Sequence, residues 1–237
     1  MKDPPRLHVD AALGAGAEIA LSEDHGRYLT SVLRLKGGDP LRLFNGRDGE
    51  FLAYLGDASK KRVSAIIEGK VADALPPPDI DFLFAPLKHA RLDYMVQKAV
   101  ELGCRRLRPV ITRRTIAERV NLDRMRANAI EAAEQCNLVF APDVLEPVKL
   151  ERALGDWDGD RALVFCDEKA AGRAALAGIT LPAAVLIGPE GGFADEERAL
   201  LHSLSFVHGI SLGPRILRAD TAGVAALALV QAAIGDM

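Results

Sequence analysis

Hydrophobic and polar positions follow two different patterns along the chain, which meet at the prolines of residues 76–78. Before them, short apolar runs separated by turn residues predict β-strands at 6–9, 41–44, 50–55 and 62–67. One helical pattern interrupts them, from about Ser22 to Leu33. The Asn-Gly and Asp-Gly pairs of residues 45–49 favour a hairpin turn between the two middle strands. These elements predict a small β-barrel.

After the prolines, predicted strands alternate with predicted helices. Apolar runs predict strands at 81–85, 107–112, 162–166, 183–187 and 209–212. Apolar residues at helical spacing predict a helix that ends before Gly103, another that follows Asn121, and a last one from near Asp220 to Ala233. This alternation is typical of a parallel sheet covered by helices on both faces. We therefore expect two domains, residues 1–75 and 79–237, joined by a stiff proline linker.

Composition narrows the class of protein. The chain has 237 residues, 49% of them hydrophobic, and a formal net charge of −3, which excludes disordered and fibrous architectures. No apolar run approaches the roughly 20 residues of a membrane span, and the N-terminus lacks the pattern of a signal peptide. Cys104, Cys136 and Cys166 are widely spaced, and the histidines show no metal-site spacing. We expect a cytoplasmic protein with reduced thiols, no metal and no membrane contact.

Charge is unevenly distributed along the chain. The segment from Lys88 to Arg126 holds 11 basic and 4 acidic residues, whereas residues 127–237 hold 8 basic and 16 acidic ones. A basic segment within an acidic protein is a candidate contact for a polyanion such as RNA. A solvated helix face and loop would give the same pattern.

A glycine-rich segment carries the first candidate chemistry. The predicted strand 183–187 ends in residues 188–193, Gly-Pro-Glu-Gly-Gly-Phe, and three acidic residues then open a helix. Parallel sheets bind ligands at such strand ends. The spacing matches neither the P-loop nor the dinucleotide motif, and Glu190 would repel a phosphate. We expect a cationic or neutral ligand, for which S-adenosylmethionine is a candidate, although a purely structural turn would also fit this motif.

A second loop, residues 211–221, again joins a predicted strand to a helix. Gly213 allows close approach to the backbone, and Leu212, Ile216 and Leu217 offer apolar walls. Arg215 and Arg218 could hold an RNA phosphate or stabilise a base, whereas loop arginines in most proteins are simply solvated.

Together these loops resemble the bacterial 16S ribosomal RNA uridine-N3 methyltransferases of the SPOUT class. The resemblance covers nearly the whole chain, and its segments are 186–193, 211–218, 97–103, 131–136 and 32–39. It implies a PUA-like RNA-binding barrel followed by an α/β domain with a C-terminal deep trefoil knot, a rare exception to unknotted folds. It also implies a homodimer that binds S-adenosylmethionine in the knot. The implied substrate is one uridine of 16S ribosomal RNA in the 30S subunit.

The resemblance also implies which residues bind the cofactor, from the two loops and a third at residues 166–168. They are Cys166, Asp167, Leu186, Ile187, Gly188, Pro189, Glu190, Gly191, Gly192, Leu212, Gly213, Ile216, Leu217 and Ala222. For catalysis we expect Arg218 to stabilise negative charge on the uracil. Asp220 and Glu190 are both candidates for the base that removes the N3 proton. The basic residues expected to contact RNA phosphates are Arg27, Arg34, Lys36, Arg42, Arg113 and Arg114.

Two other functions remain open, and the chain departs from the family pattern in three places. A non-catalytic RNA-binding ribosome-assembly factor would need no cofactor, and a SPOUT methyltransferase could act on another RNA atom. Asn137 and Leu138 lie where the family commonly has Gly-Arg, so one possible RNA-contacting arginine is missing. Ala219 and Asp220 lie where the family usually has Thr-Glu, so the acid is one methylene shorter. Ala194 lies where a capping side chain is usual, so we expect helix capping to contribute about 1 kcal/mol less to stability unless Asp195 compensates.

Overall fold

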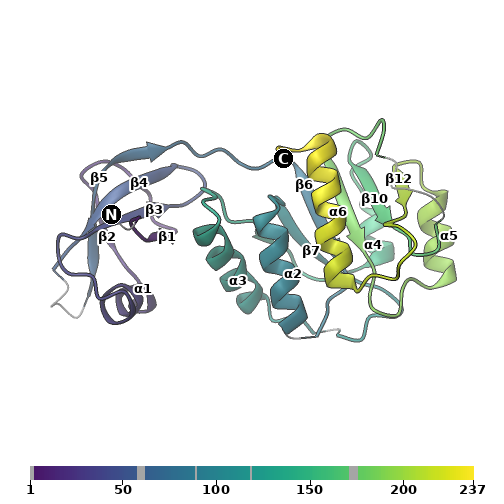
Figure 1. Cartoon of the computed structure of the whole chain (residues 1–237), viewed down its shortest axis with the longest axis horizontal. Coiled ribbons are helices and arrows are strands. Elements are labelled where there is room, and N and C mark those ends of the chain that lie inside the picture. The colour runs from purple at the N-terminus through teal and green to yellow at the C-terminus, as the bar shows by residue number, and fades with distance from the viewer. Residues whose placement is uncertain (1–2, 58–61, 89, 118, 171–175) are drawn as a thin grey trace. The chain divides into compact units, whose positions relative to one another are not determined.

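The computed structural model describes residues 3–57, 62–88, 90–117, 119–170 and 176–237 (Figure 1). The chain forms two compact units. The first consists of residues 1–76 with 133–141, and the second of residues 77–132 with 142–237. Residues 133–141 pack within the first unit, although the predicted boundary at the prolines assigns them to the second domain.

A five-stranded sheet of order β1-β3-β4-β5-β2 builds the first unit around an apolar core. Its strands are β1 (Arg6–His8), β2 (Glu18–Ala20), β3 (Pro40–Phe44), β4 (Glu50–Leu55) and β5 (Ser64–Ala72). Antiparallel pairing of β3 with β4 confirms the predicted hairpin. The predicted helix begins after Ser22, whose hydroxyl accepts a hydrogen bond from the His25 amide, and consists of α1 (Glu23–Arg27) and the π-helical turn η1 (Tyr28–Val32).

The structure differs from the prediction for this sheet in the bounds of one strand and in one additional strand. The strand predicted at residues 62–67 is β5, which begins at Ser64 and continues to Ala72. Its pairing with β4 shifts register at two irregularities, which let the strand bend and extend further. β2 was not predicted, because its three residues are too few to show an alternation of apolar and polar positions.

Arg6 fastens residues 133–141 within the first unit. Its guanidinium donates to the carbonyl oxygens of Ala133, Glu134 and Leu138 at 3.0, 2.9 and 2.8 Å and also pairs with the buried carboxylate of Glu50. Between these carbonyls Asn137 has a φ of +62°, a left-handed conformation that asparagine tolerates better than most residues. Asparagine therefore supplies here the backbone conformation for which glycine is commonly used.

We expect Arg6→Ala to lower the free energy of unfolding by about 3–5 kcal/mol, because it leaves a buried carboxylate and three carbonyls without their donor. Arg42→Ala is the matched control, since Arg42 pairs with the same Glu50 at 3.7 Å from a side chain that is 38% exposed. Its expected loss is about 0–1 kcal/mol. Urea unfolding followed by circular dichroism measures both, and equal losses would contradict this account of Arg6.

A parallel sheet of order β12-β10-β11-β6-β7-β8 forms the second unit, with β9 paired to β7. Its strands are β6 (Ile80–Phe84), β7 (Arg106–Ile111), β8 (Asp143–Val144), β9 (Val148–Lys149), β10 (Ala162–Cys166), β11 (Ala183–Ile187) and β12 (Val207–Ile210). The helices are α2 (Ala90–Glu101), α3 (Leu122–Gln135), α4 (Leu150–Gly155), α5 (Asp195–Ser203) and α6 (Ala219–Ile234). Helices α2 and α6 cover one face of the sheet, and α4 and α5 cover the other (Figure 1).

Most expected elements of this unit are confirmed. β10 and β11 have the predicted bounds, Gly103 has a φ of +71° after α2, and the Asn121 side chain accepts from the Arg124 amide at 3.0 Å before α3. The last strand is an exception, because residues 207–210 pair with residues 163–166 of β10 and the predicted residues 211–212 have already left the sheet. The short β8, β9 and α4 were not predicted.

Among the described residues, no helix combines the length and apolar character needed to span a bilayer. The same part of the chain contains no group of three or more His, Cys, Asp or Glu side chains that could hold a metal ion.

Candidate active site

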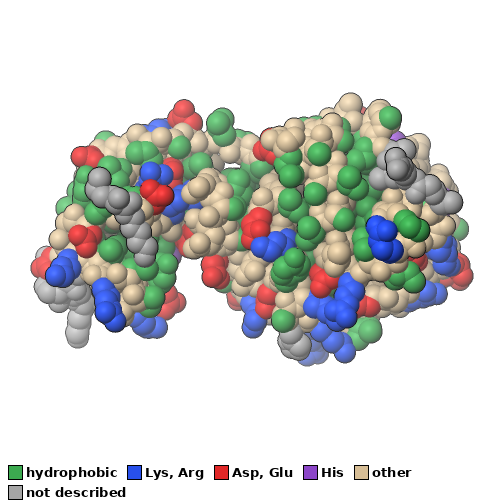
Figure 2. All heavy atoms as spheres, viewed as in Figure 1, with side chains coloured by type: hydrophobic (Ala, Val, Ile, Leu, Met, Phe, Trp, Pro, Cys, Tyr) green, Lys and Arg blue, Asp and Glu red, His purple; other side chains and the backbone are tan. Residues whose placement is uncertain are grey.

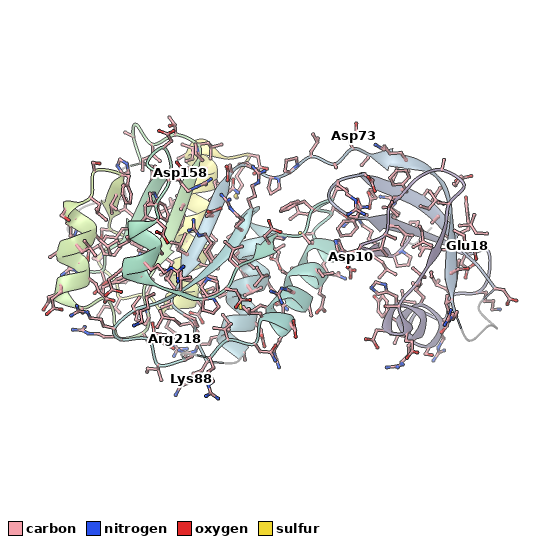
Figure 3. The ribbon with its side chains drawn as sticks, turned by 180° about the vertical axis from the view of Figure 1, so that it is seen from behind. Asp10, Glu18, Asp73, Lys88, Asp158 and Arg218 are labelled. Atoms are coloured by element: carbon pink, nitrogen blue, oxygen red, sulfur yellow. The ribbon has the colours of Figure 1, made fainter. Side chains whose placement is uncertain are left out.

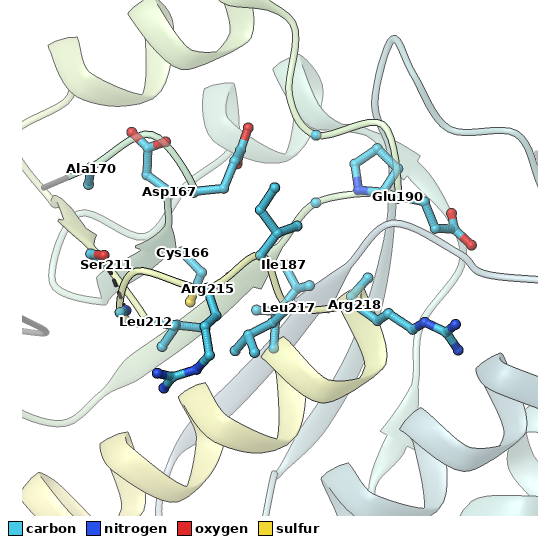
Figure 4. Close-up of a pocket in the computed structure, with 18 of the residues that line it drawn as sticks. Cys166, Asp167, Ala170, Ile187, Glu190, Ser211, Leu212, Arg215, Leu217 and Arg218 are labelled. Carbon is cyan, nitrogen blue, oxygen red and sulfur yellow. Dashed lines mark hydrogen bonds between the residues drawn. The ribbon is translucent and has the colours of Figure 1, made fainter.

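Three loops line a cavity of about 480 Å³ at the carboxyl ends of β10, β11 and β12 (Figure 4). They are residues 166–170, 187–192 and 211–219, and helices α2 and α6 add Arg91 and Ala222. β11 lies between β10 and β6, so the strand order changes direction at this point of the sheet. Open α/β sheets bind ligands at such switch points, and the volume lies within the roughly 300–1,000 Å³ of small-molecule sites.

Most of the residues proposed for the cofactor lie on this cavity. They are Cys166, Asp167, Ile187, Gly188, Pro189, Glu190, Gly192, Leu212, Gly213, Ile216, Leu217 and Ala222. Leu186 is absent because its side chain is fully buried in the core under α4 and α5. Gly191 is also absent from the lining, and its carbonyl oxygen accepts from Arg114 at 2.9 Å.

The two proposed catalytic residues differ in placement. Arg218 lines the cavity at the start of α6 with an exposed side chain that makes no hydrogen bond or ion pair to any described residue. Asp220 does not line it, and its carboxylate accepts from the Thr221 amide at 2.8 Å within the same helix. Glu190, the other candidate base, lies on the cavity and pairs with Arg91 across 3.8 Å.

Gly188 has no space for a side chain. A Cβ atom at this position would lie 2.6 Å from a ring carbon of Phe193. Phe193 is only 1% exposed and packs edge-on against Phe165 with the ring centroids 5.0 Å apart. The backbone of the β11 loop is therefore folded directly onto a fixed aromatic ring, which holds the floor of the cavity in place.

Asp167 lines the cavity, and its carboxylate is already engaged by hydrogen bonds from neighbouring protein groups. It accepts from Arg198 Nη2 at 2.7 Å, from the Lys169 amide at 2.9 Å, and it lies 2.9 Å from His202 Nε2. Burial alone would raise the pKa of Asp167, but the hydrogen bonds from Arg198, Lys169 and His202 outweigh it and hold the pKa below its ordinary value. Asp167 is thus an anion that shapes the wall.

Neighbouring groups give the cavity two kinds of surface. Cys166 contributes an inert thiol, because burial raises its pKa to about 12. The backbone amides of Leu212, Ile216 and Leu217 make no hydrogen bond to any described residue and are available to a ligand. In Figure 4 the side chains of Arg218 and Glu190 extend to one side of the cavity, and that of Arg215 extends away from them.

The sequence matches known families over most of its length. Residues 75–231 match the family model of an RNA methyltransferase domain, and residues 21–68 match that of an RNA methyltransferase PUA domain. A protein from Rickettsia conorii named ribosomal RNA small subunit methyltransferase E is 32% identical over 232 residues, which cover 95% of this chain and 94% of that protein. The chain belongs to the ribosomal RNA small subunit methyltransferase E family.

Solved structures of similar proteins share the whole fold. A ribosomal RNA small subunit methyltransferase E from Neisseria gonorrhoeae, bound to S-adenosyl methionine, aligns with a TM-score of 0.89 at 29% identity and covers 99% of this chain and 100% of its own. A putative methyltransferase from Legionella pneumophila, in complex with the same cofactor, aligns with a TM-score of 0.87 at 29% identity and equal coverage. The expected fold class, a PUA-type sheet followed by a SPOUT-like parallel sheet with helices, is confirmed. The trefoil knot itself stays a prediction.

The basic residues proposed for RNA contact in this family member fall into two groups. In the first unit Arg27 is the exposed last residue of α1 and pairs with Asp24 at 3.5 Å. Arg34 and Lys36 are exposed on the segment that follows η1, and Arg42 pairs with Glu50. Arg34 has a φ of +59°, which is uncommon for a side chain of its size.

In the second unit, Arg113 pairs with Glu196 at 3.2 Å and Arg114 donates to Gly191, so both are already tied to the β11 loop and α5. On this unit Lys and Arg side chains gather where α2 and α6 begin (Figure 2), the end at which Lys88 and Arg218 lie (Figure 3). Residues 89 and 118 of the basic segment lie outside the described residues.

Sequence reasoning missed several cavity residues of this family member. Arg91 lies far from the loops in sequence, and only the packing of α2 beside α6 brings it to the cavity. Ala170, Ser211, Pro214 and Ala219 also line it, and their proximity to the predicted loops was the available signal. Glu168 lines the cavity as well. It was recognised as part of the third loop but not proposed as a contact.

Proposed function

We propose that this protein uses S-adenosylmethionine to methylate N3 of a specific uridine in 16S ribosomal RNA, with the assembled 30S subunit as its substrate. The observation that carries the proposal is Arg218, which has no partner among the described residues, at a cavity built from the ends of three parallel strands. Family membership and the cofactor-bound structures of relatives support the reaction class.

The residues of the cavity fit S-adenosylmethionine. Leu212, Leu217 and Ile187 supply apolar walls, and the loop amides that bond to none of the described residues can hydrogen-bond an adenine edge. Glu168 and Glu190 place carboxylates on a cavity whose ligand carries a positive sulfonium and ammonium, and no phosphate that they would repel. When bound, this cofactor supplies an electrophilic methyl group.

Arg218 would act on the uracil. N3 of uracil must lose its proton, and the negative charge then spreads to O2 and O4. Arg218 is always charged and has no competing partner among the described residues. It also lies at the N-terminus of the 16-residue helix α6, whose dipole adds positive potential at the same place. Both features stabilise the developing charge in the transition state.

For the proton acceptor we favour Glu190 over Asp220. Glu190 lies on the cavity, whereas Asp220 is turned to its own helix amide. The uridine must leave any base stack to reach the cavity, at a cost of a few kcal/mol that phosphate contacts by the basic residues would offset. We further propose that the active form is a homodimer and that the C-terminal segment is knotted, as the family resemblance implies.

Transfer of labelled methyl groups tests the proposal. Purified protein is incubated with labelled S-adenosylmethionine and either unmethylated 30S subunits or free 16S RNA. We expect label in the RNA of the subunits at a rate well above that of free RNA. Cofactor binding without any label in either RNA would contradict the proposal and favour a non-catalytic assembly factor.

A further inference from the structure

Helix α5 holds three segments around the cavity although it contributes no lining residue of its own among those described. Its first turn carries Asp195, Glu196, Glu197 and Arg198 in succession. The buried contacts of Glu197 form one set, and the contacts of Asp195 and Arg198 form a second, while Glu196 pairs with the exposed side chain of Arg113. One set fastens the β11 loop to the turn that follows β7, and the other fastens the β10 loop.

Glu197 joins the first pair of segments. Its side chain is 2% exposed, and its two oxygens accept from the Arg113 amide and the Ala194 amide, each at 2.8 Å. Arg113 belongs to the turn 112–115, which is closed by a hydrogen bond between the buried hydroxyls of Thr112 and Thr115 at 2.9 Å. Ala194 ends the β11 loop. One buried carboxylate therefore ties the loop that lines the cavity to a rigid turn.

The same contact settles how α5 is capped. Ala194 has no side chain that could cap the helix, and the carboxylate of Glu197 reaches back to the Ala194 amide instead. Asp195 does not take over the capping role, because its carboxylate pairs with Lys169 at 2.9 Å. Lys169 belongs to the β10 loop.

Arg198 attaches the β10 loop to helix α5. Its Nη2 atom donates to both carboxylate oxygens of Asp167 at 2.7 Å, and its Nε atom donates to Oδ1 at 3.1 Å. His202, one turn later on α5, reaches the same carboxylate. The β10 loop is thereby attached to α5 through Asp167, beside the attachment that Lys169 makes to Asp195.

We propose that Glu197 and Arg198 are positioning residues that set the two walls of the cofactor cavity from one helix. Glu197 fixes the β11 loop, and Arg198 fixes the β10 loop. Neither side chain touches the cavity, so both act through the backbone and through Asp167. The inference rests on the proposed function, since the ligand of the cavity is taken to be S-adenosylmethionine.

Glu197→Gln is the sharpest variant because it preserves size and shape. The amide nitrogen of glutamine is a donor, and facing a backbone N–H it cannot replace the lost acceptor. One of the two ties is then broken and the β11 loop is released at one end. A displacement of about 1 Å is enough to cost about 100-fold in a site that depends on position.

Calorimetric titration with S-adenosylmethionine tests the proposal in the full-length protein. We expect Glu197→Gln to raise the dissociation constant by at least about tenfold at unchanged stoichiometry. Arg198→Gln should do the same, and Arg198→Lys should lose less because it keeps the charge beside Asp167. Glu196→Gln is the matched control, since Glu196 is the neighbouring acid with a side chain that is 70% exposed, and its dissociation constant should stay within about twofold.

Hydrogen exchange in the cofactor-free protein gives an independent measurement. Amides of residues 188–194 should exchange faster in Glu197→Gln than in wild type or Glu196→Gln. A lower melting temperature with wild-type affinity in the folded fraction and unchanged exchange would overturn the inference and leave Glu197 a purely structural residue. A wild-type protein that binds no S-adenosylmethionine would refute the proposed function, and the exchange result would then still decide whether Glu197 positions the loop.

Discussion

Arg218→Ala is expected to slow methyl transfer by about 100–1,000-fold, the usual effect of removing one donor that stabilises transition-state charge. Cofactor affinity should change little, because the Arg218 side chain is exposed at the cavity and is proposed to stabilise charge on the uracil. Single-turnover transfer to 30S subunits measures the rate, and calorimetry measures the affinity. A transfer rate within a few-fold of wild type would show that Arg218 has no role in the chemistry.

Arg215→Ala separates this effect from simple loss of RNA attraction. Arg215 is an exposed arginine of the same loop, but its side chain extends away from Arg218 and Glu190 (Figure 4). We expect a higher KM for subunits that depends on salt, with kcat nearly unchanged, since a phosphate contact acts equally on ground state and transition state. Equal losses of kcat in the two variants would assign both arginines the same role.

Gly188→Ala is expected to weaken cofactor binding by more than tenfold and to destabilise the second unit by about 1–3 kcal/mol, the range of overpacking in a closed core. The added methyl group would lie 2.6 Å from the ring of Phe193, which cannot move because it is packed on Phe165. The strand end would have to shift and carry the cavity floor with it. Calorimetry and thermal unfolding measure the two effects.

The same loop supplies the control for this variant. A Cβ atom on Gly191 would meet Arg114 no closer than 3.6 Å, which is ordinary van der Waals contact, so Gly191→Ala should bind cofactor nearly as wild type does. A Gly188→Ala, Phe193→Leu double variant replaces the obstructing ring with a smaller side chain and should recover part of the lost cofactor affinity. If Gly191→Ala and Gly188→Ala were equally impaired, the steric explanation would fail.

The sequence predicts the parallel sheet well because β10 and β11 are buried on both faces and read as continuous apolar runs. It predicts β12 poorly, because residues 209–212 are as apolar as a strand yet residues 211–212 turn towards the cavity. Only the pairing with β10 determines where that strand ends. The short β2, β8 and β9 depend likewise on their partners and have no pattern of their own.

Local sequence motifs predict the loops of the site but not the side chains of α5 that hold these loops in place. Both glycine-containing loops follow predicted strands, which is why most of the proposed cofactor residues lie on one cavity. Charge patterns were less informative: Arg113 and Arg114 look like RNA contacts in sequence, but the structure pairs them with Glu196 and Gly191. The roles of Glu197 and Arg198 arise from contacts with residues 84 and 31 positions away, which no local pattern encodes.

The identity of the methylated nucleoside decides whether the protein acts on N3 of uridine. RNA from subunits treated with the protein and S-adenosylmethionine is digested to nucleosides, which are separated and identified by mass spectrometry against standards. We expect N3-methyluridine as the single new product, from 16S RNA alone. A ribose-methylated nucleoside or a methylated guanine would contradict it, and would leave the cofactor cavity in place with another target atom.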